Sequence, residues 1–374
     1  MTVFARSDTS VLGRWWWTVD RWTLAAIGTL IVVGVIMAFA ASPAVAKHYQ
    51  YDYLYFARRQ LVYIPFALAL LLSVSLLSPR GVLRIALISL AIFSLLVLLT
   101  FIFGSETKGA QRWLPLGPLS IQPSEFIKPA FAVVAAWLFS SARAKTLPHA
   151  NVVSTILFSL ITVMLLLQPD IGMTAVISAV WAFQFFLAGL PLYWAALLFL
   201  GGFAGIIVAY LSLPHVSSRI NQFLDRSSGD SYQVDRSLEA FVNGGWFGVG
   251  PGEGTVKEVL PDAHSDFVFA VAGEEFGLFI CLIIVGLFGF IVLRGFARAL
   301  QETDLFILLA TSGLLIQFGL QAVINMSSTL RLIPTKGMTL PFVSYGGSSL
   351  VAMGLCMGFL LALTRKRLDP SVLK

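Results

Sequence analysis

Charged residues are scarce in this 374-residue chain: Asp, Glu, Lys and Arg make up 12% of it, against about 25% in an ordinary soluble domain. Hydrophobic residues make up 57%, and the mean hydropathy is +0.85. These values exclude a soluble globular fold. The formal net charge of +6 does not indicate a nucleic-acid partner, because the basic residues lie mostly in short loops between apolar blocks, where they set topology and meet lipid head groups.

Cysteine is rarer still, with Cys281 and Cys356 as the only two. Both fall inside apolar blocks, where a thiol packs as a small hydrophobic side chain, so neither a disulfide framework nor a cysteine metal cluster is indicated. No internal repeat is evident, which leaves an inverted-repeat transporter without support. The alternating pattern of a membrane β-barrel is also absent.

The chain does contain apolar blocks long enough to cross a bilayer as helices, which takes about 20 residues. Because backbone polar groups must be satisfied within lipid, we expect an all-α polytopic membrane protein that forms a single domain over 1–374. About ten spans are predicted, at 23–46, 54–78, 82–103, 124–141, 152–168, 171–188, 190–213, 267–293, 304–330 and 341–364. Between the fifth and sixth, a tight hairpin places Asp170 as the cap of the next helix.

The N-terminal part resembles a secretory signal, with an A-x-A sequence at 44–46. The apolar run over 23–46 is too long for a cleaved signal, which carries about 7–15 apolar residues. We interpret it as an uncleaved first span that follows a cytoplasmic segment, 1–22.

Orientation follows from the placement of Lys and Arg. The tail 365–374 is basic and the predicted number of spans is even, so both termini are expected to be cytoplasmic. The long loop 214–265, between the seventh and eighth spans, then faces the periplasm or the exterior. Cations on that face, such as Arg112 and Lys336, require a reason, and an anionic ligand would supply one.

Three external segments depart from the composition of the spans: 104–128, 214–266 and 331–349. In the first, Glu125 and Lys128 share one face if a helix begins near Ser124, and opposite charges three apart then pair. The pair could anchor a helix end at the interface, or it could be buried in a cavity, since ionisable groups within spans are usually functional. The spacing alone does not separate these alternatives.

The end of the second segment and the start of the eighth span contain several ionisable residues. Asp266 opens the eighth span and would serve as a helix N-cap, unless it has a chemical role. His264 is either a proton relay or an interfacial histidine. Glu274 and Glu275 lie two turns into the helix, where an unpaired carboxylate is costly. These acids could bind a metal, but their spacing matches no metal motif.

The third segment places Arg331 and Lys336 beside proline-containing turns at a helix start. Cations and helix N-termini together bind phosphates. Anchoring to lipid head groups is a strong alternative for both.

Five motifs in order carry a family resemblance: KGAQRWLPLGPLSIQPSEFIKP, QPDIGMTAV, GGWFGVGPGEG, LPDAHSDFVFAVAGEEFG and PTKGMTLPFVSYGGSS. Over nearly its whole length the chain resembles the SEDS glycosyltransferases, the group that contains FtsW and RodA. The PTKGMTLPF form is more similar to division-type FtsW than to elongation-type RodA. One stretch departs from the pattern: INMSSTLRLIPTKG (324–337) has serines and Arg331 where many relatives have glycines.

The resemblance implies that the chain polymerises lipid II, a polyprenyl-diphosphate-linked disaccharide peptide, on the outer face of the cytoplasmic membrane. Asp266 matches the catalytic aspartate, the general base that takes the proton of the acceptor hydroxyl. Glu125 and Lys128 match cavity residues near it. Arg112, Lys336 and Arg331 are the candidates for the diphosphate. Further candidates for substrate binding lie within the matching motifs: Trp113, His264, Ser344 and Tyr345.

The leaving group is a polyprenyl diphosphate, so either basic side chains or a divalent cation (Mg²⁺ or Mn²⁺) would neutralise its charge. The family acts with a class B penicillin-binding transpeptidase and with other membrane proteins of the division complex. Two other functions stay open from the sequence, a lipid II flippase and a non-catalytic division scaffold. The ionisable groups concentrate on one side of the membrane, which favours the enzyme over the flippase.

Overall fold

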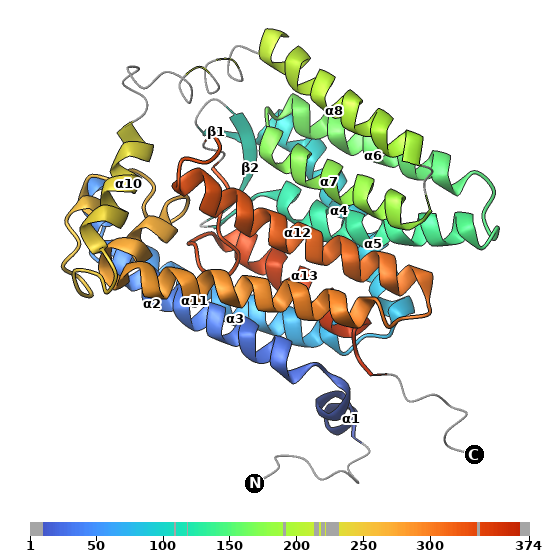
Figure 1. Cartoon of the computed structure of the whole chain (residues 1–374), viewed down its shortest axis with the longest axis horizontal. Coiled ribbons are helices and arrows are strands. Elements are labelled where there is room, and N and C mark those ends of the chain that lie inside the picture. The colour runs from blue at the N-terminus through green and yellow to red at the C-terminus, as the bar shows by residue number, and fades with distance from the viewer. Residues whose placement is uncertain are drawn as a thin grey trace.

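The computed structural model of the protein describes residues 10–107, 110–117, 119–189, 192–212, 217, 221, 232–334 and 337–366. They form a bundle of long helices with a small sheet and a short helix at one end (Figure 1). The helices are α1 (Val11–Thr18), α2 (Arg21–His48), α3 (Tyr55–Ser75), α4 (Pro79–Phe103), α5 (Pro123–Arg143), α6 (Ala150–Leu167), α7 (Ile171–Leu187), α8 (Leu192–Ser212), α10 (Tyr232–Gly244), the 3₁₀ turn η2 (Val256–Glu258), α11 (Val268–Ala299), α12 (Leu305–Thr329) and α13 (Gly347–Leu363).

A helix occupies each of the ten predicted spans, which confirms a polytopic, predominantly helical membrane protein. Seven of the described helices are long and apolar enough to cross a bilayer, namely α2 to α6, α11 and α12, while α7 and α13 are apolar with 17 residues each. The number of crossings stays a prediction.

Two helices form the centre of the bundle. In α5, 83% of the most apolar 18-residue window is buried, and in α12 67%, against 22% in α4. The outer helices therefore turn apolar faces outward, as expected where lipid replaces water. Polar side chains that α5 and α12 carry are consequently enclosed by protein.

The expectation of an all-α chain missed a small sheet. The stretch predicted as a loop before α5 forms three antiparallel strands, β1 (Ser105–Thr107), β2 (Ala110–Leu116) and β3 (Leu119–Ile121), in the order β1-β2-β3. The register pairs Ser105 with Trp113 and Leu114 with Ile121. Strands of three residues are too short to show a recognisable alternation. The described end of the predicted loop 214–265 is ordered, with α10 packed against α11.

Two predicted helix starts had different outcomes. Asp170 caps α7 as expected, because its carboxylate accepts a hydrogen bond from the Met173 amide at 3.2 Å. Asp266 is not the N-cap of α11: the helix begins at Val268, its N-cap is Phe267, and no side chain caps it. The cap interpretation of Asp266 was therefore wrong.

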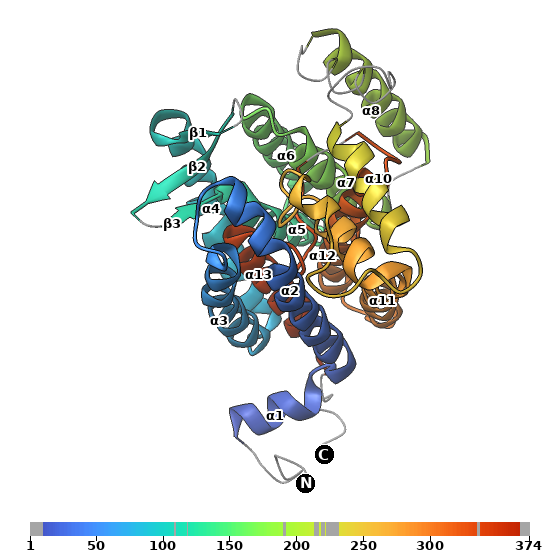
Figure 2. The ribbon, with the colours of Figure 1, turned by 90° about the vertical axis from the view of Figure 1, so that its left-hand side faces the viewer.

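The two ends of the described chain meet at one end of the bundle. The Lys366 amide donates to the Thr18 carbonyl at 3.0 Å, and Arg294 binds Asp20 at the start of α2. Burial of the Asp20 carboxyl works to raise its pKa, but hydrogen bonds from Arg294 and Thr23 and the charge of Arg298 outweigh burial and lower the pKa. The sheet and α10 lie at the opposite end (Figures 1 and 2).

Candidate active site

A polar cavity of about 740 Å³ opens at the end of the bundle that carries the sheet and α10. Its lining comes from α3, the sheet, the first turn of α5 and the loops that precede α11 and α13. Six predicted site residues line it: Arg112, Trp113, Glu125, His264, Asp266 and Tyr345. The sequence motifs that carry these residues are far apart in the chain, and the fold brings them to one place.

Glu125 and Lys128 form the buried pair that the spacing allowed. The helix begins at Pro123, so both residues lie in its first turns. Glu125 Oε2 lies 2.8 Å from Lys128 Nζ, outside hydrogen-bonding geometry, and their side chains are 4% and 1% exposed. This burial excludes the interfacial-anchor alternative, because an exposed anchor would keep its charges in water.

A side-chain amide on α12 connects the buried pair to the rest of the site. Lys128 Nζ donates to Gln321 Oε1 at 2.7 Å. Gln321 Nε2 then donates to the Thr339 carbonyl at 3.2 Å. The Thr339 and Ser349 hydroxyls are hydrogen-bonded at 2.7 Å, so the ion pair is connected to the loop before α13.

Asn325, one turn further along α12, holds the backbone beside Asp266. Its Nδ2 donates to the Asp266 carbonyl at 2.9 Å and to the Met338 carbonyl at 2.6 Å. The Asp266 carboxylate itself lies against the same loop, because a Cβ placed on Gly337 would be 3.4 Å from Oδ2. Gln321 and Asn325 therefore fix two loops on one face of α12, and sequence reasoning missed both amides.

The loop before α13 is also tied directly to the loop before α11. The Ser344 hydroxyl donates to the Ser265 carbonyl and accepts from the Leu340 amide at 2.8 Å. The Tyr345 amide donates to the His264 carbonyl at 2.9 Å. Ser344 is buried and outside the cavity lining, so the structure places this predicted substrate residue in a bracing position.

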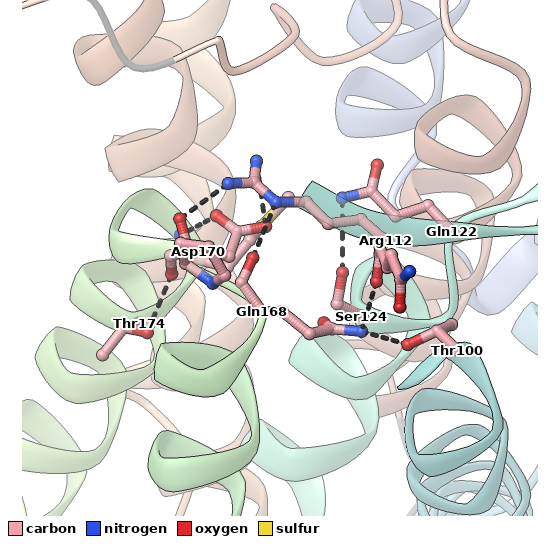
Figure 3. A network of polar contacts seen from close by, with 10 residues as sticks. Thr100, Arg112, Gln122, Ser124, Gln168, Asp170 and Thr174 are labelled. Carbon is pink, nitrogen blue, oxygen red and sulfur yellow. Dashed lines mark hydrogen bonds and ion pairs between the residues drawn. The ribbon is translucent and has the colours of Figure 1, made fainter. Parts of the chain in front are cut away.

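Arg112 reaches from β2 to the hairpin between α6 and α7 (Figure 3). Its Nε donates to the Gln168 carbonyl at 3.0 Å and its Nη2 to the Pro169 carbonyl at 2.6 Å. Its Nη1 lies 3.7 Å from Asp170 Oδ2. Arg112 lines the cavity, but its guanidinium is engaged by the protein on all three nitrogens.

Of the remaining two cations predicted for the diphosphate, Arg331 is not in the lining. Arg331 pairs with Asp235 of α10, and its backbone takes a left-handed conformation with φ of 58°. The stretch that departs from the family pattern is helical as far as Thr329, and the Ser328 hydroxyl donates to the Asn325 carbonyl at 2.8 Å. Lys336 lies outside the described residues.

Glu274 is fully enclosed and hydrogen-bonded. Its carboxylate accepts four hydrogen bonds of 2.7–3.0 Å, from Asn243 Nδ2 and from the backbone amides of Thr255, Val256 and Lys257. The side chain of Glu275 pairs with Lys257, which is itself buried. Both acids therefore fasten the loop after α10 onto α11, and this accounts for their position inside a helix.

The sequence also overlooked Arg59 as a site residue. Arg59 lies on α3, lines the cavity and donates to the Tyr55 hydroxyl at 2.9 Å. A cation inside a predicted span is the signal that could have identified it. Burial raises the pKa of the neighbouring Tyr345 to about 12, although Arg59 works to lower it.

The fold is that of a multi-pass helical membrane protein. One end of its bundle contains a cavity that is lined by Asp266 and lies beside the buried Glu125–Lys128 pair, an arrangement typical of an enzyme. The family described as Cell cycle protein, which comprises FtsW, RodA and SpoVE, matches residues 21–368. The chain belongs to this family.

Curated relatives and solved structures agree with this assignment. The chain is 42% identical to the probable peptidoglycan glycosyltransferase FtsW of Caulobacter vibrioides, over 97% of this chain and 94% of that protein. It is 36% identical to the protein of the same name from Saccharophagus degradans, over 87% of each chain. Its fold matches the rod shape determining protein RodA of Thermus thermophilus with a TM-score of 0.70 and 27% identity, over 93% and 97% of the chains.

A second similar structure is one chain of a multi-protein complex. A chain of a peptidoglycan synthase complex, described as coordinating polymerization and crosslinking, matches with a TM-score of 0.78 and 27% identity. The match covers 92% of this chain and 97% of that one.

Proposed function

We propose that this chain polymerises lipid II into glycan strands at the cavity that contains Asp266. The chain is a division-type peptidoglycan glycosyltransferase, as its family and its FtsW relatives show. The observation that carries the assignment of Asp266 is its place in the cavity lining, with its backbone held by Asn325 and its carboxylate against Gly337.

Asp266 acts as the general base of the transfer. The acceptor sugar hydroxyl attacks the anomeric carbon of the donor, the bond from that carbon to the diphosphate oxygen breaks, and the hydroxyl proton goes to the Asp266 carboxylate. A positioned base of this kind contributes about 10²–10⁴-fold to a rate. Because Asn325 fixes the Asp266 carbonyl, the carboxylate is presented to the acceptor without a large search of conformations.

Glu125 and Lys128 support the site from the interior of the bundle. Glu125 lines the cavity, whereas Lys128 lies behind it and reaches Gln321. The pair sets the electrostatic environment in which the acceptor proton and the departing diphosphate change charge. Its link through Gln321 to Thr339 also holds the loop against which Asp266 lies.

The polyprenyl diphosphate leaves with its charge neutralised. Lys336 is proposed for this role, because it immediately precedes Gly337 in the sequence, and a Cβ placed on Gly337 would be 3.4 Å from Asp266 Oδ2. Within the described residues no three His, Cys, Asp or Glu side chains form a ready metal site. Mg²⁺ needs only one or two carboxylates when phosphate oxygens complete its shell, so the diphosphate of the substrate would supply most of the ligands of a Mg²⁺ or Mn²⁺ ion. Such an ion would supply Lewis-acid stabilisation of the diphosphate.

The cavity faces the periplasm or exterior and both termini are cytoplasmic. The basic tail supports this orientation, as does the meeting of the chain ends, through Thr18 and Lys366, at the end of the bundle opposite the cavity. A lipid II head group then meets the site after it has crossed the membrane.

A class B penicillin-binding transpeptidase is the proposed partner, together with other division-complex membrane proteins. Support comes from the similarity to a subunit of a peptidoglycan synthase complex that couples polymerization to crosslinking. A strand made at the cavity would pass directly to the enzyme that cross-links it.

The experiment compares purified wild-type protein with Asp266→Asn in lipid II polymerisation, with the transpeptidase partner present. Asn keeps the size of the side chain but cannot take up the proton. We expect the variant to insert and to bind its partner while polymer formation falls by about 10²-fold or more. Polymer at the wild-type rate would refute the general base, and lipid II transport in vesicles without polymer by the wild type would favour a flippase.

A further inference from the structure

One wall of the cavity is a continuous row of aromatic rings. Its members come from the loop after α2, the start of α3 and the loops before α11 and α13, and all of them line the cavity: Tyr49, Tyr51, Tyr55, Phe56, His264 and Tyr345. The proposed catalysis uses none of the three outer members. We name these the tyrosine row: Tyr49, Tyr51 and Tyr55.

The outer rings are stacked and open to solvent. The Tyr49 and Tyr51 ring centroids are 6.2 Å apart with an interplanar angle of 23°. Tyr51 and Tyr55 stack more closely, at 4.4 Å and 22°. Tyr49 and Tyr51 are each 51% exposed. Tyr51 stacks with both neighbours and Tyr49 with one of them, so the exposed half of each ring forms a stacked aromatic surface at the mouth of the cavity.

The inner rings carry the row to the site. Phe56 packs against His264 and Tyr345, with centroids 4.3 and 5.2 Å apart, and its ring also contacts Tyr55 at 5.2 Å. His264 is close to Asp266 in the chain, and the Ser265 carbonyl between them is held by Ser344. A ligand that follows the row from the mouth arrives beside the proposed base.

The chemistry of this wall selects one part of the substrate. A cation, Arg59, meets the row at its inner member Tyr55, but the exposed outer rings of Tyr49 and Tyr51 are uncharged and do not suit a diphosphate. A polyprenyl tail would need an apolar groove without hydroxyls. Tyrosine combines a large apolar ring with a polar edge. A pyranose ring has the matching form, with C–H groups on its faces and hydroxyl and acetamido groups at its rim, so sugar rings stack on tyrosine while their substituents form hydrogen bonds.

We propose that the tyrosine row binds the glycan strand, a linear chain of N-acetylated amino sugars, while it is extended at Asp266. The assignment rests on the proposed polymerase function and adds the place where the polymer lies. A strand that stays bound between additions receives more sugars before it is released. The row consequently determines strand length.

A neighbouring tyrosine, Tyr53, is a matched control that separates strand binding from simple anchoring at the membrane interface. Tyrosines are common where a membrane meets water, and a belt of this kind would include Tyr53. Tyr53 is 66% exposed and lies between Tyr51 and Tyr55 in the sequence, but it is not part of the cavity lining. If the tyrosines only anchored the chain at the interface, Tyr51 and Tyr53 would contribute alike. A glycan strand bound in the cavity would contact Tyr51 but not Tyr53.

The experiment uses full-length Tyr51→Ala, Tyr51→Phe and Tyr53→Ala. The first readout is calorimetric binding of lipid-free oligosaccharides of the glycan repeat, which requires no catalysis. The second is the length distribution of strands made from lipid II. We expect Tyr51→Ala to weaken oligosaccharide binding about tenfold, the loss of 1.4 kcal/mol for one stacked ring, and to shorten the strands. Tyr51→Phe retains most of both properties, and Tyr53→Ala resembles the wild type.

Each contrary outcome has a distinct meaning. Wild-type affinity and strand length in Tyr51→Ala, equal losses in Tyr51→Ala and Tyr53→Ala, or no oligosaccharide binding by the wild type would each overturn the proposal. If Tyr51→Ala is unstable, Tyr51→Phe with the affinity of the wild type and Tyr49→Ala with reduced affinity still support it. Ring-dependent binding without polymer from lipid II would leave the row in place and refute the polymerase function instead.

Discussion

Asp266 and Glu274 belong to one sequence motif, yet the fold gives these two acids opposite surroundings. Glu274 is completely buried, and its carboxylate accepts hydrogen bonds from three backbone amides and from Asn243. Asp266 lies in the lining of the cavity, where a substrate can reach it. The comparison shows that two acids of one motif can have different places in the fold: Glu274 fastens a loop to α11, and Asp266 lines the cavity.

Glu125 is an intermediate case, because it lines the cavity but is also paired with Lys128. Two cations are, like Glu274, held by the protein. Arg112 and Lys257 are engaged by carbonyl or carboxylate oxygens of the protein. Variants of these residues test whether the two acids differ in role as they differ in surroundings.

The largest effect is expected on stability, from Glu274→Ala. The change leaves the amides of Thr255, Val256 and Lys257 without their acceptor in a buried place, at about 1–3 kcal/mol for each. The loop that leads to Asp266 then separates from α11. Thermal unfolding in detergent should show a midpoint far below that of the wild type. A midpoint within a degree or two of the wild type would mean that this acid is not a fastening element.

Next in size is the buried pair of Glu125 and Lys128. Removal of one partner leaves a buried charge uncompensated, which costs about 3–5 kcal/mol, whereas an exposed pair is worth about 1 or less. Glu125→Ala and Lys128→Ala should each impair polymerisation severely, and the charge swap should rescue it only in part. Near-normal polymerisation by both single variants would show that the pair has no influence on the site.

The smallest effect belongs to Lys336. Lys336→Ala should raise the lipid II concentration that gives the half-maximal rate, because one cation for the diphosphate is lost, and Lys336→Arg should keep part of the function. A charge-assisted hydrogen bond of about 1.5–3 kcal/mol corresponds to roughly a 10–100-fold change in that concentration. An unchanged concentration would assign this lysine to lipid head groups.

Much of the fold could be predicted, because lipid demands long apolar helices whose positions are visible in the sequence. The Glu125–Lys128 pair was also predictable, since its spacing within a helix is local. Its burial was not, because that depends on α12 covering α5. The contacts of Arg112 with Gln168 and Pro169 join residues far apart in the chain, and no local pattern contains them.

The wrong helix cap shows how tertiary structure overrides a local signal. Asp262 takes a left-handed backbone conformation with φ of 53°, and its carbonyl accepts the amides of Ser265, Asp266 and Phe267 at 3.0–3.4 Å. This turn satisfies the amides ahead of α11 and delays the helix to Val268. The Asp266 side chain is thereby placed in the cavity lining rather than over the helix end.

The most direct test of the account measures Asp266→Asn and Glu274→Gln side by side. For each purified variant, the thermal midpoint is recorded first, and lipid II polymerisation is then measured per folded molecule at a temperature below both midpoints. We predict that Asp266→Asn keeps the wild-type midpoint and makes almost no polymer, whereas Glu274→Gln has a lowered midpoint and its folded fraction still polymerises. Polymerisation by Asp266→Asn, or a folded and stable Glu274→Gln without activity, would contradict the account.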